Sequence, residues 1–334
     1  MKSTHLITGI TGQDGIFLSS KIIKSDRDAR IIGISRDSNL TFFKNKLSYV
    51  HGKDYNFENI KVENINLEDK EIVKFLIEES QPDFIYNLSG PSSVYDSLTD
   101  DFKSHDQIIR IFDNLIDSVI KSKNTCNFFQ ASSSEMFAPS ELPLDENSKM
   151  DPRSPYAIAK LNIHNKIQSL KLQENFVISS GIMFNHESEF RANQYLIMKI
   201  INFVINIEKK HNDVLKIGSL DLIRDWSYAK DVANAIYEIN SKNMSQDYVI
   251  GSGEGTPISE VLSIIFSFFN LDWSRHVEID NRLLRKGDPL SIVSNPTKIN
   301  NQLNWKSEHS IEDLLKRCIS YKKNVTQNEE PDFS

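Results

Sequence analysis

The chain has 334 residues, of which 39% are hydrophobic and 25% are charged, as in ordinary globular proteins. This length predicts two lobes. An excess of 46 acidic over 39 basic residues, with no basic stripe, excludes a typical nucleic-acid-binding protein. No apolar run approaches the ~20 residues of a membrane helix, and the N-terminus lacks a signal-peptide pattern. Only Cys126 and Cys318 are present, so we expect no disulfide framework and no metal site. Together, these features predict a cytoplasmic protein, and we expect an enzyme.

Strand and helix patterns alternate over the first 182 residues. Short buried-type segments predict strands at residues 6–8, 29–35, 60–65, 84–88, 127–131 and 176–182. Apolar residues at helical spacing predict helices at 16–23, 69–79, 106–121 and 156–172. This alternation predicts an α/β fold, in which a doubly wound parallel sheet has helices on both faces.

After residue 182 the pattern is looser and predicts a second, smaller lobe over 183–323. Helices are expected at 192–210, 230–240 and 258–270, with a strand at 248–250. We expect the chain to return to the first domain between 225 and 250. The polar and acidic residues 324–334 predict a loose tail.

Three of the twelve glycines, Gly9, Gly12 and Gly15, lie between the first predicted strand and the first helix. Glycines at this position let the backbone turn tightly and approach a pyrophosphate, whose charge then sits at the helix N-terminus. The alternative is a turn that only caps an ordinary helix. The spacing resembles that of the short-chain dehydrogenase/reductase superfamily.

The second predicted strand ends at Arg36 and Asp37, which give conflicting signals. An acidic residue there would bind the ribose hydroxyls of NAD, whereas an arginine suits the 2′-phosphate of NADP. Because Arg36 continues directly from the strand, we expect NADP rather than NAD. A solvated surface pair is the alternative.

Ser133 and Glu135 follow a predicted strand, and Tyr156 and Lys160 begin the next helix. Residues four apart share a helix face, and the lysine ammonium is expected to lower the tyrosine pKa so that Tyr156 can act as a base. The Ser133 hydroxyl can bond the same substrate oxygen. Glu135 can remove a second proton, beside a newly formed ketone, or only satisfy backbone donors at a helix start.

Together these motifs resemble the GDP-mannose 4,6-dehydratase family of the extended short-chain dehydrogenases. The matching segments are residues 6–15, 85–88, 130–135, 152–156, 184–188, 224–226, 229–231 and 303–306. The Asn-His-Glu-Ser segment at 185–188 and the Arg-Asp-Trp segment at 224–226 are far more restrictive than the glycine-rich turn. The resemblance implies a Rossmann-type cofactor domain and a nucleotide-sugar-binding second lobe.

The resemblance also implies an activity and a site. The implied reaction is a lyase conversion of GDP-mannose to GDP-4-keto-6-deoxymannose, by internal hydride transfer with loss of water. The implied catalytic residues are Ser133, Glu135, Tyr156 and Lys160. The implied NADP-binding residues are Gly9, Thr11, Gly12, Gln13, Asp14, Gly15, Arg36, Asn66, Leu67 and Leu88, with Tyr156 and Lys160. The implied GDP-sugar contacts are Ser92, Ser93, Asn185, Glu187, Lys199, Arg224 and Arg285.

Several segments depart from the family pattern. The loop expected at 39–46 and the segment 88–94 differ, and Glu189-Phe190 replaces a usual Pro-Arg. These departures leave GDP-N-acetylglucosamine or GDP-heptose as alternative sugars. A 4-epimerase or 4-oxidase would leave Glu135 idle, and a silent NADP-binding scaffold would usually lack the Tyr or the Lys. Apolar residues on the helices at 106–121 and 156–172 predict a homodimer or homotetramer.

Overall fold

The computed structural model describes residues 2–36, 40–52, 57–92, 94–100, 102–123, 125–172, 177–207, 214–284 and 287–327. Seven parallel strands form its main sheet, in the order β10-β6-β5-β4-β1-β2-β3. The strands are β1 (Thr4–Thr8), β2 (Arg30–Ile34), β3 (Ile60–Glu63), β4 (Phe84–Asn87), β5 (Asn127–Ser133), β6 (Val177–Met183) and β10 (Asp247–Ile250). The predicted doubly wound parallel sheet is confirmed.

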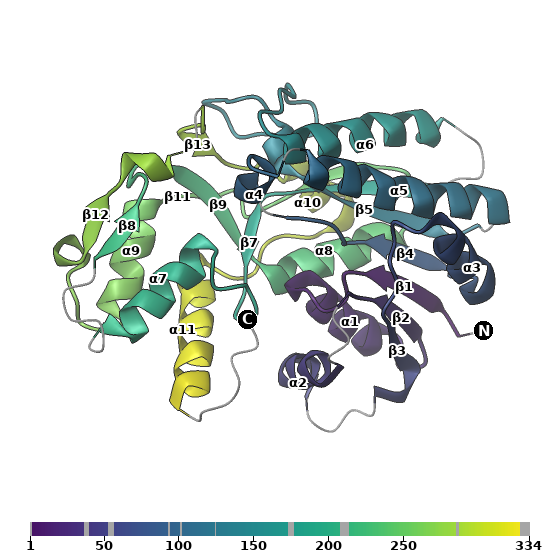
Figure 1. The fold of residues 1–334 in the computed structure, drawn as a ribbon, viewed down its shortest axis with the longest axis horizontal. Helices are drawn as coiled ribbons and strands as arrows, with labels where there is room; N and C mark the ends of the chain where they lie inside the picture. Colours follow the sequence, from purple (N-terminus) through teal and green to yellow (C-terminus); the bar gives the residue numbers. More distant parts are fainter. Residues whose placement is uncertain are drawn as a thin grey trace.

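Helices cover both faces of this sheet (Figure 1). One face carries α1 (Gln13–Ser25), α2 (Leu40–His51) and α8 (Ala229–Ser241), and the other carries α3 (Lys70–Ser80), α5 (Lys103–Ser122) and α6 (Pro155–Lys171). Successive strand residues point to opposite faces. Leu6 therefore packs in the core under α3, α5 and α6, whereas Ile7 packs in the core under α1 and α8. Burial on both faces explains why these strands read as continuous apolar segments.

The second lobe is smaller and has short strands. A four-stranded sheet contains β7 (Asn185–Glu187), β9 (Ile223–Tyr228), β11 (Gly255–Pro257) and β13 (Ser291–Ile292), and β8 (Leu215–Ile217) pairs with β12 (Val277–Ile279). The other main helices are α7 (Leu196–Ile205), α9 (Ile258–Ser267), α10 (Thr297–Leu303) and α11 (Ile311–Gln327). Between these elements, α8 and β10 return to the main sheet. No helix in the described part of the chain is long and apolar enough to span a lipid bilayer.

Three expectations about local structure need correction. The loop expected at 39–46 is largely helix α2, which buries Phe43 and Leu47, four residues apart. The helix expected at 192–210 is shorter, since α7 spans only Leu196–Ile205. Helix α11 continues to Gln327 because Leu314, Cys318, Tyr321 and Val325 are buried at helical spacing, so residues 324–327 do not belong to a loose tail. Residues 328–334 lie outside the described residues.

Helices α5 and α6, from which an oligomer was expected, direct much of their apolar surface inward. Their apolar side chains, including Phe112, Leu115 and Ile163, lie in the core of this same chain. Their outer surface instead carries polar pairs such as Lys166–Asp113 at 2.7 Å. Most apolar side chains of these helices therefore pack within one subunit, and the homodimer or homotetramer stays a prediction.

Candidate active site

The glycine-rich turn lies where the strand order of the main sheet reverses, between β1 and β4. Gly9 has φ +72°, and a Cβ there would lie 3.0 Å from the Leu88 carbonyl oxygen. A Cβ on Gly15 would lie 2.5 Å from Cα and O of Ile10. Side chains are thus excluded at both positions, and bare backbone faces the carboxyl ends of the strands. Ligands of doubly wound folds bind at this topological switch point.

A continuous cavity of about 1070 Å³ begins at this turn and extends to the second lobe. The predicted cofactor residues all line it: Gly9, Thr11, Gly12, Gln13, Asp14, Gly15, Arg36, Asn66, Leu67, Leu88, Tyr156 and Lys160. The bare turn at the start of α1 and the length of the cavity fit a dinucleotide cofactor. Arg36 is exposed at the end of β2, beside a 2.8 Å hydrogen bond between the Thr11 and Ser35 hydroxyls. Asp37 lies outside the described residues.

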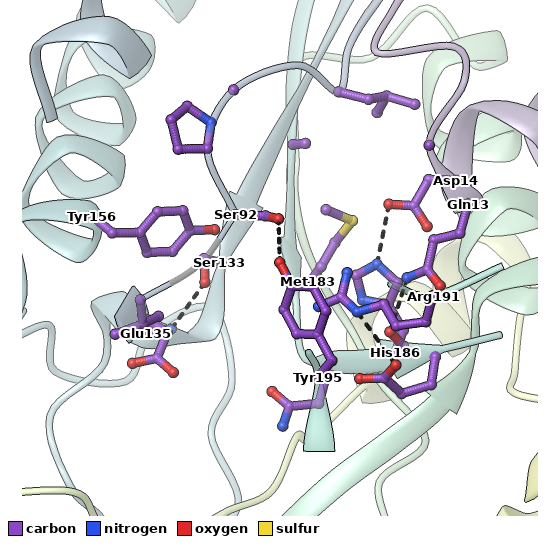
Figure 2. Close-up of a pocket in the computed structure, with 18 of the residues that line it drawn as sticks. Gln13, Asp14, Ser92, Ser133, Glu135, Tyr156, Met183, His186, Arg191 and Tyr195 are labelled. Carbon is purple, nitrogen blue, oxygen red and sulfur yellow. Dashed lines mark hydrogen bonds and ion pairs between the residues drawn. The ribbon is translucent and has the colours of Figure 1, made fainter. Parts of the chain in front are cut away.

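Gln13 and Asp14 also connect the turn to β7. The Gln13 amide donates to the His186 carbonyl at 3.0 Å, and Asp14 lies 3.1 Å from His186 Nε2 (Figure 2). Burial lowers the pKa of His186, but the Asp14 carboxylate outweighs this effect and the net pKa is raised. His186 belongs to the Asn-His-Glu-Ser segment, but its contact with the turn was not predicted from the sequence. The motif marks His186 as a candidate residue, but its contact with Asp14 joins positions 172 residues apart and cannot be seen in the sequence.

Ser133, Tyr156 and Lys160 come together because α6 begins beside the end of β5. Ser154 caps α6 by accepting from Ala157 N at 3.1 Å, and Pro155 follows at the first helical position. This start places Tyr156 and Lys160 on the helix face toward β5, and Lys160 Nζ donates to the Ala131 carbonyl at 2.9 Å. Figure 2 shows the Tyr156 hydroxyl and the Ser133 hydroxyl pointing into the same space.

Glu135 stands in a short 3-10 helix directly after β5. Its backbone N–H donates to Ser133 Oγ at 3.3 Å, whereas its half-buried side chain lines the cavity (Figure 2). The carboxylate also contributes to raising the pKa of Tyr156, which places it within electrostatic range of the phenol. Glu135 therefore forms part of the cavity wall near the Tyr156 phenol.

Burial controls the electrostatics of this site. It raises the pKa of Tyr156 to about 12, although a hydrogen bond with Ser133 opposes the rise. Burial also lowers the pKa of Lys160 to about 8. The expectation that Lys160 brings the tyrosine pKa toward neutrality is wrong for this structure. Lys160 Nζ lies 5.6 Å from the Tyr156 ring centroid and is bonded to a backbone carbonyl.

A second wall of the cavity comes from β7 and the start of α7. Arg191 Nε lies 3.3 Å from the carboxylate of Glu187, whose pKa is raised by burial. The Arg191 guanidinium stacks 3.5 Å from the Tyr195 ring centroid, and the Tyr195 hydroxyl is 2.9 Å from Ser92 Oγ. The sequence analysis missed Arg191 and Tyr195. Their only sequence signal is the four-residue spacing from Glu187 onward.

Of the expected GDP-sugar contacts, Asn185, Lys199 and Arg224 also line the cavity. Lys199 Nζ donates to the Lys216 carbonyl at 3.1 Å. Arg224 is buried and donates to Asp288 at 2.8 Å and to the Pro289 carbonyl at 3.0 Å. Ser93 and Arg285 lie outside the described residues.

Comparison with known proteins agrees with this geometry. The sequence model of the family described as GDP-mannose 4,6 dehydratase matches residues 6–318. The chain belongs to this family. It is 30% identical over 318 residues to GDP-mannose 4,6 dehydratase 2 of Arabidopsis thaliana, covering 94% of this chain and 85% of that protein. It is 28% identical to the human GDP-mannose 4,6 dehydratase, covering 95% of this chain and 91% of that protein.

Solved structures share the fold of this member of the GDP-mannose 4,6-dehydratase family. A dTDP-glucose 4,6-dehydratase from Streptomyces venezuelae superposes with a TM-score of 0.84 at 18% identity, covering 98% of this chain and 99% of that one. A UDP-glucose 4-epimerase from Thermotoga maritima gives 0.81, also at 18% identity, covering 97% and 99%. A Rossmann-type domain with a smaller second lobe is therefore the shared architecture.

One departure from the family pattern proves remote from the cavity. Glu189 is buried and accepts hydrogen bonds from the Tyr228 hydroxyl at 3.1 Å. Phe190 packs against the rings of Phe17 and Tyr321. Neither side chain lines the cavity. The segment 88–92, in contrast, lines it directly, so this departure bears on what the site binds.

Proposed function

We propose that the protein is an NADP-dependent GDP-mannose 4,6-dehydratase that acts in the cytoplasm as a homodimer or homotetramer. Its reaction converts GDP-mannose to GDP-4-keto-6-deoxymannose and water. The observation that carries the proposal is the gathering of Ser133, Glu135 and Tyr156 on one wall of a cavity that begins at the glycine-rich turn. Arg36 at the end of β2 supports NADP over NAD, because a guanidinium matches a phosphate in charge and geometry.

Tyr156 and Ser133 act on the oxygen at carbon 4. A dinucleotide cofactor held along the glycine-rich turn, Gly9 to Gly15, would supply a hydride acceptor for carbon 4 and a hydride donor for carbon 6. Tyr156 takes the hydroxyl proton, while Ser133 bonds the same oxygen. Burial keeps Tyr156 protonated near neutral pH, so its base form needs a stabilising charge. We propose that the Lys160 ammonium, 5.6 Å from the Tyr156 ring centroid on the same helix face, supplies that charge in the complex with substrate.

Glu135 carries the second proton transfer. The ketone formed at carbon 4 acidifies the proton on carbon 5, and the Glu135 carboxylate removes it. The same group then protonates the departing hydroxyl of carbon 6. Acid–base roles of this kind contribute roughly 10²–10⁴-fold in rate. An epimerase or 4-oxidase needs no such group, and its product would keep the oxygen at carbon 6.

Mass spectrometry of reactions with GDP-mannose tests the proposal. The wild-type protein with NADP should produce a sugar that has lost one water. Glu135→Gln should stop at a 4-keto sugar that retains the oxygen of carbon 6, and Tyr156→Phe should not oxidise the sugar at all. Glu141→Gln is a matched control, since Glu141 is exposed and does not line the cavity. Normal dehydration by Glu135→Gln would contradict the role of the carboxylate.

Two other sugars remain as comparisons in the same assay. GDP-N-acetylglucosamine and GDP-heptose are candidates because the segment 88–92 departs from the family pattern and lines the cavity. We expect kcat/KM to be highest for GDP-mannose. A higher value for either alternative would reassign the sugar and leave the dehydratase chemistry in place.

A further inference from the structure

The wall that faces Tyr156 carries a hydroxyl pair, and the scheme above gives its Tyr195 member no role. Ser92 Oγ and Tyr195 Oη lie 2.9 Å apart. Ser92 belongs to the segment after β4 in the cofactor domain, whereas Tyr195 directly precedes α7 in the second lobe. The pair therefore bridges the two lobes across the cavity that both residues line.

The Tyr195 ring is held in place by its surroundings. Its backbone N–H donates to the Ala192 carbonyl at 3.2 Å, and the Arg191 guanidinium stacks on the ring at 3.5 Å. Arg191 is in turn paired with the buried Glu187 carboxylate at 3.3 Å. A ring fixed in this way presents its hydroxyl to a ligand at little further cost in side-chain entropy.

The position of the pair relative to the reacting groups indicates what it would contact. In Figure 2 the Ser92–Tyr195 bond and the Glu135 carboxylate lie on opposite sides of the Ser133 hydroxyl. Tyr195 also contributes to raising the pKa of Tyr156, so the two phenols are within electrostatic range. If Tyr156 and Ser133 hold the oxygen of carbon 4 and Glu135 faces carbons 5 and 6, the opposite edge of the hexose consists of carbons 2 and 3.

We propose that Tyr195, together with Ser92, binds the hydroxyls on the carbon 2–carbon 3 edge of the hexose and thereby positions carbon 4 for Tyr156. This inference rests on the proposed function. Both protein hydroxyls can donate and accept, so a sugar hydroxyl can replace their mutual hydrogen bond with one bond to each. Tyr195 is thus a substrate-positioning and specificity-determining residue.

The test compares wild type with Tyr195→Phe, which keeps the ring and its stacking on Arg191 but removes the hydroxyl. We expect kcat/KM for GDP-mannose to fall about 3–10-fold, as for loss of one neutral hydrogen bond. Affinity for GDP alone should not change. With the 2-deoxy or the 3-deoxy analogue of GDP-mannose, whichever lacks the contacted hydroxyl, wild type and variant should become equal within about 2-fold. Tyr49→Phe, outside the cavity, is the matched control.

Unchanged kcat/KM in Tyr195→Phe would overturn the proposal, and so would an equal loss on GDP-mannose and on both deoxy analogues. A parallel loss of GDP affinity would also overturn it, because the change would then be a general distortion. Calorimetry separates this from the proposed function. If wild type binds GDP-mannose but does not dehydrate it, the proposed function fails, while the ratio of GDP-mannose to GDP affinity in wild type and variant still decides the role of Tyr195.

Discussion

Replacement of Lys160 by methionine should make the protein more stable while abolishing its activity. Lys160 is buried, and burial lowers its pKa from the usual 10.5 to about 8. At a pH below both pKa values the lysine is protonated in the folded and the unfolded chain, and burying its ammonium then costs ~3 kcal/mol of stability. Methionine fills a similar volume and carries no charge.

The lost hydrogen bond offsets only part of this gain. Lys160 Nζ donates to the Ala131 carbonyl, and that oxygen also accepts from the Gln130 amide at 2.7 Å, so it keeps a partner in the variant. Loss of this charge-assisted contact costs ~1.5 kcal/mol. The net expectation for Lys160→Met is a gain of ~1.5 kcal/mol in the free energy of unfolding near pH 7.

The gain should depend on pH in a defined direction. Between pH 8 and 10.5 the unfolded chain binds the lysine proton and the folded chain does not, so wild-type stability rises with pH. The difference between variant and wild type should therefore shrink toward zero near pH ~9.5. Thermal unfolding of both proteins at pH 7 and 9.5, without added cofactor, measures this difference in the free energy of unfolding. Lys166→Met, at an exposed position on the same helix, should show no such dependence.

A destabilised Lys160→Met at pH 7, or a gain that is the same at both pH values, would refute this reasoning. The first result would mean that the lysine contributes packing or bonding that outweighs the burial of its charge. The second would mean that its proton is not bound differently by the folded and unfolded chains.

Three further predictions concern the cofactor and the pH dependence of turnover. Arg36→Ala should weaken NADP binding by roughly 10–100-fold and NAD binding much less, as measured by titration; equal weakening would show that Arg36 does not contact the 2′-phosphate. Gly15→Ala should lower stability by ~1–3 kcal/mol, and cofactor affinity with it, because the added Cβ meets Ile10 backbone atoms at 2.5 Å; a variant as stable as wild type would mean that the turn yields easily. Since burial places the pKa of Lys160 at about 8, kcat should decline above that pH as the ammonium loses its proton; a flat alkaline profile would argue against a charged Lys160 in turnover.

The parts of the fold that follow from local pattern could be predicted. The main strands are buried on both faces, so they read as apolar segments, and Gly9 and Gly15 mark a turn that excludes side chains. Tyr156 and Lys160 share a face because of their spacing alone. These features need no knowledge of distant contacts.

The remaining parts depend on tertiary packing. Helix α2 buries only Phe43 and Leu47, and β13 has two residues, so neither gives a clear periodic signal. Ser92 and Tyr195 are separated by 103 residues, and only the assembled lobes bring their hydroxyls together. The pKa of Tyr156 is set by how deeply α6 is buried, which the four-residue spacing to Lys160 does not reveal.

The measurement that most directly tests the central claim is isotope tracing with GDP-mannose deuterated at carbon 4. The proposed reaction removes that hydrogen as hydride and returns it within the same site, while Glu135 allows water to leave. We predict a product one water lighter that retains the deuterium at carbon 6, with no net build-up of reduced cofactor. The account would be contradicted if deuterium accumulated in reduced cofactor and the sugar product kept the oxygen of carbon 6.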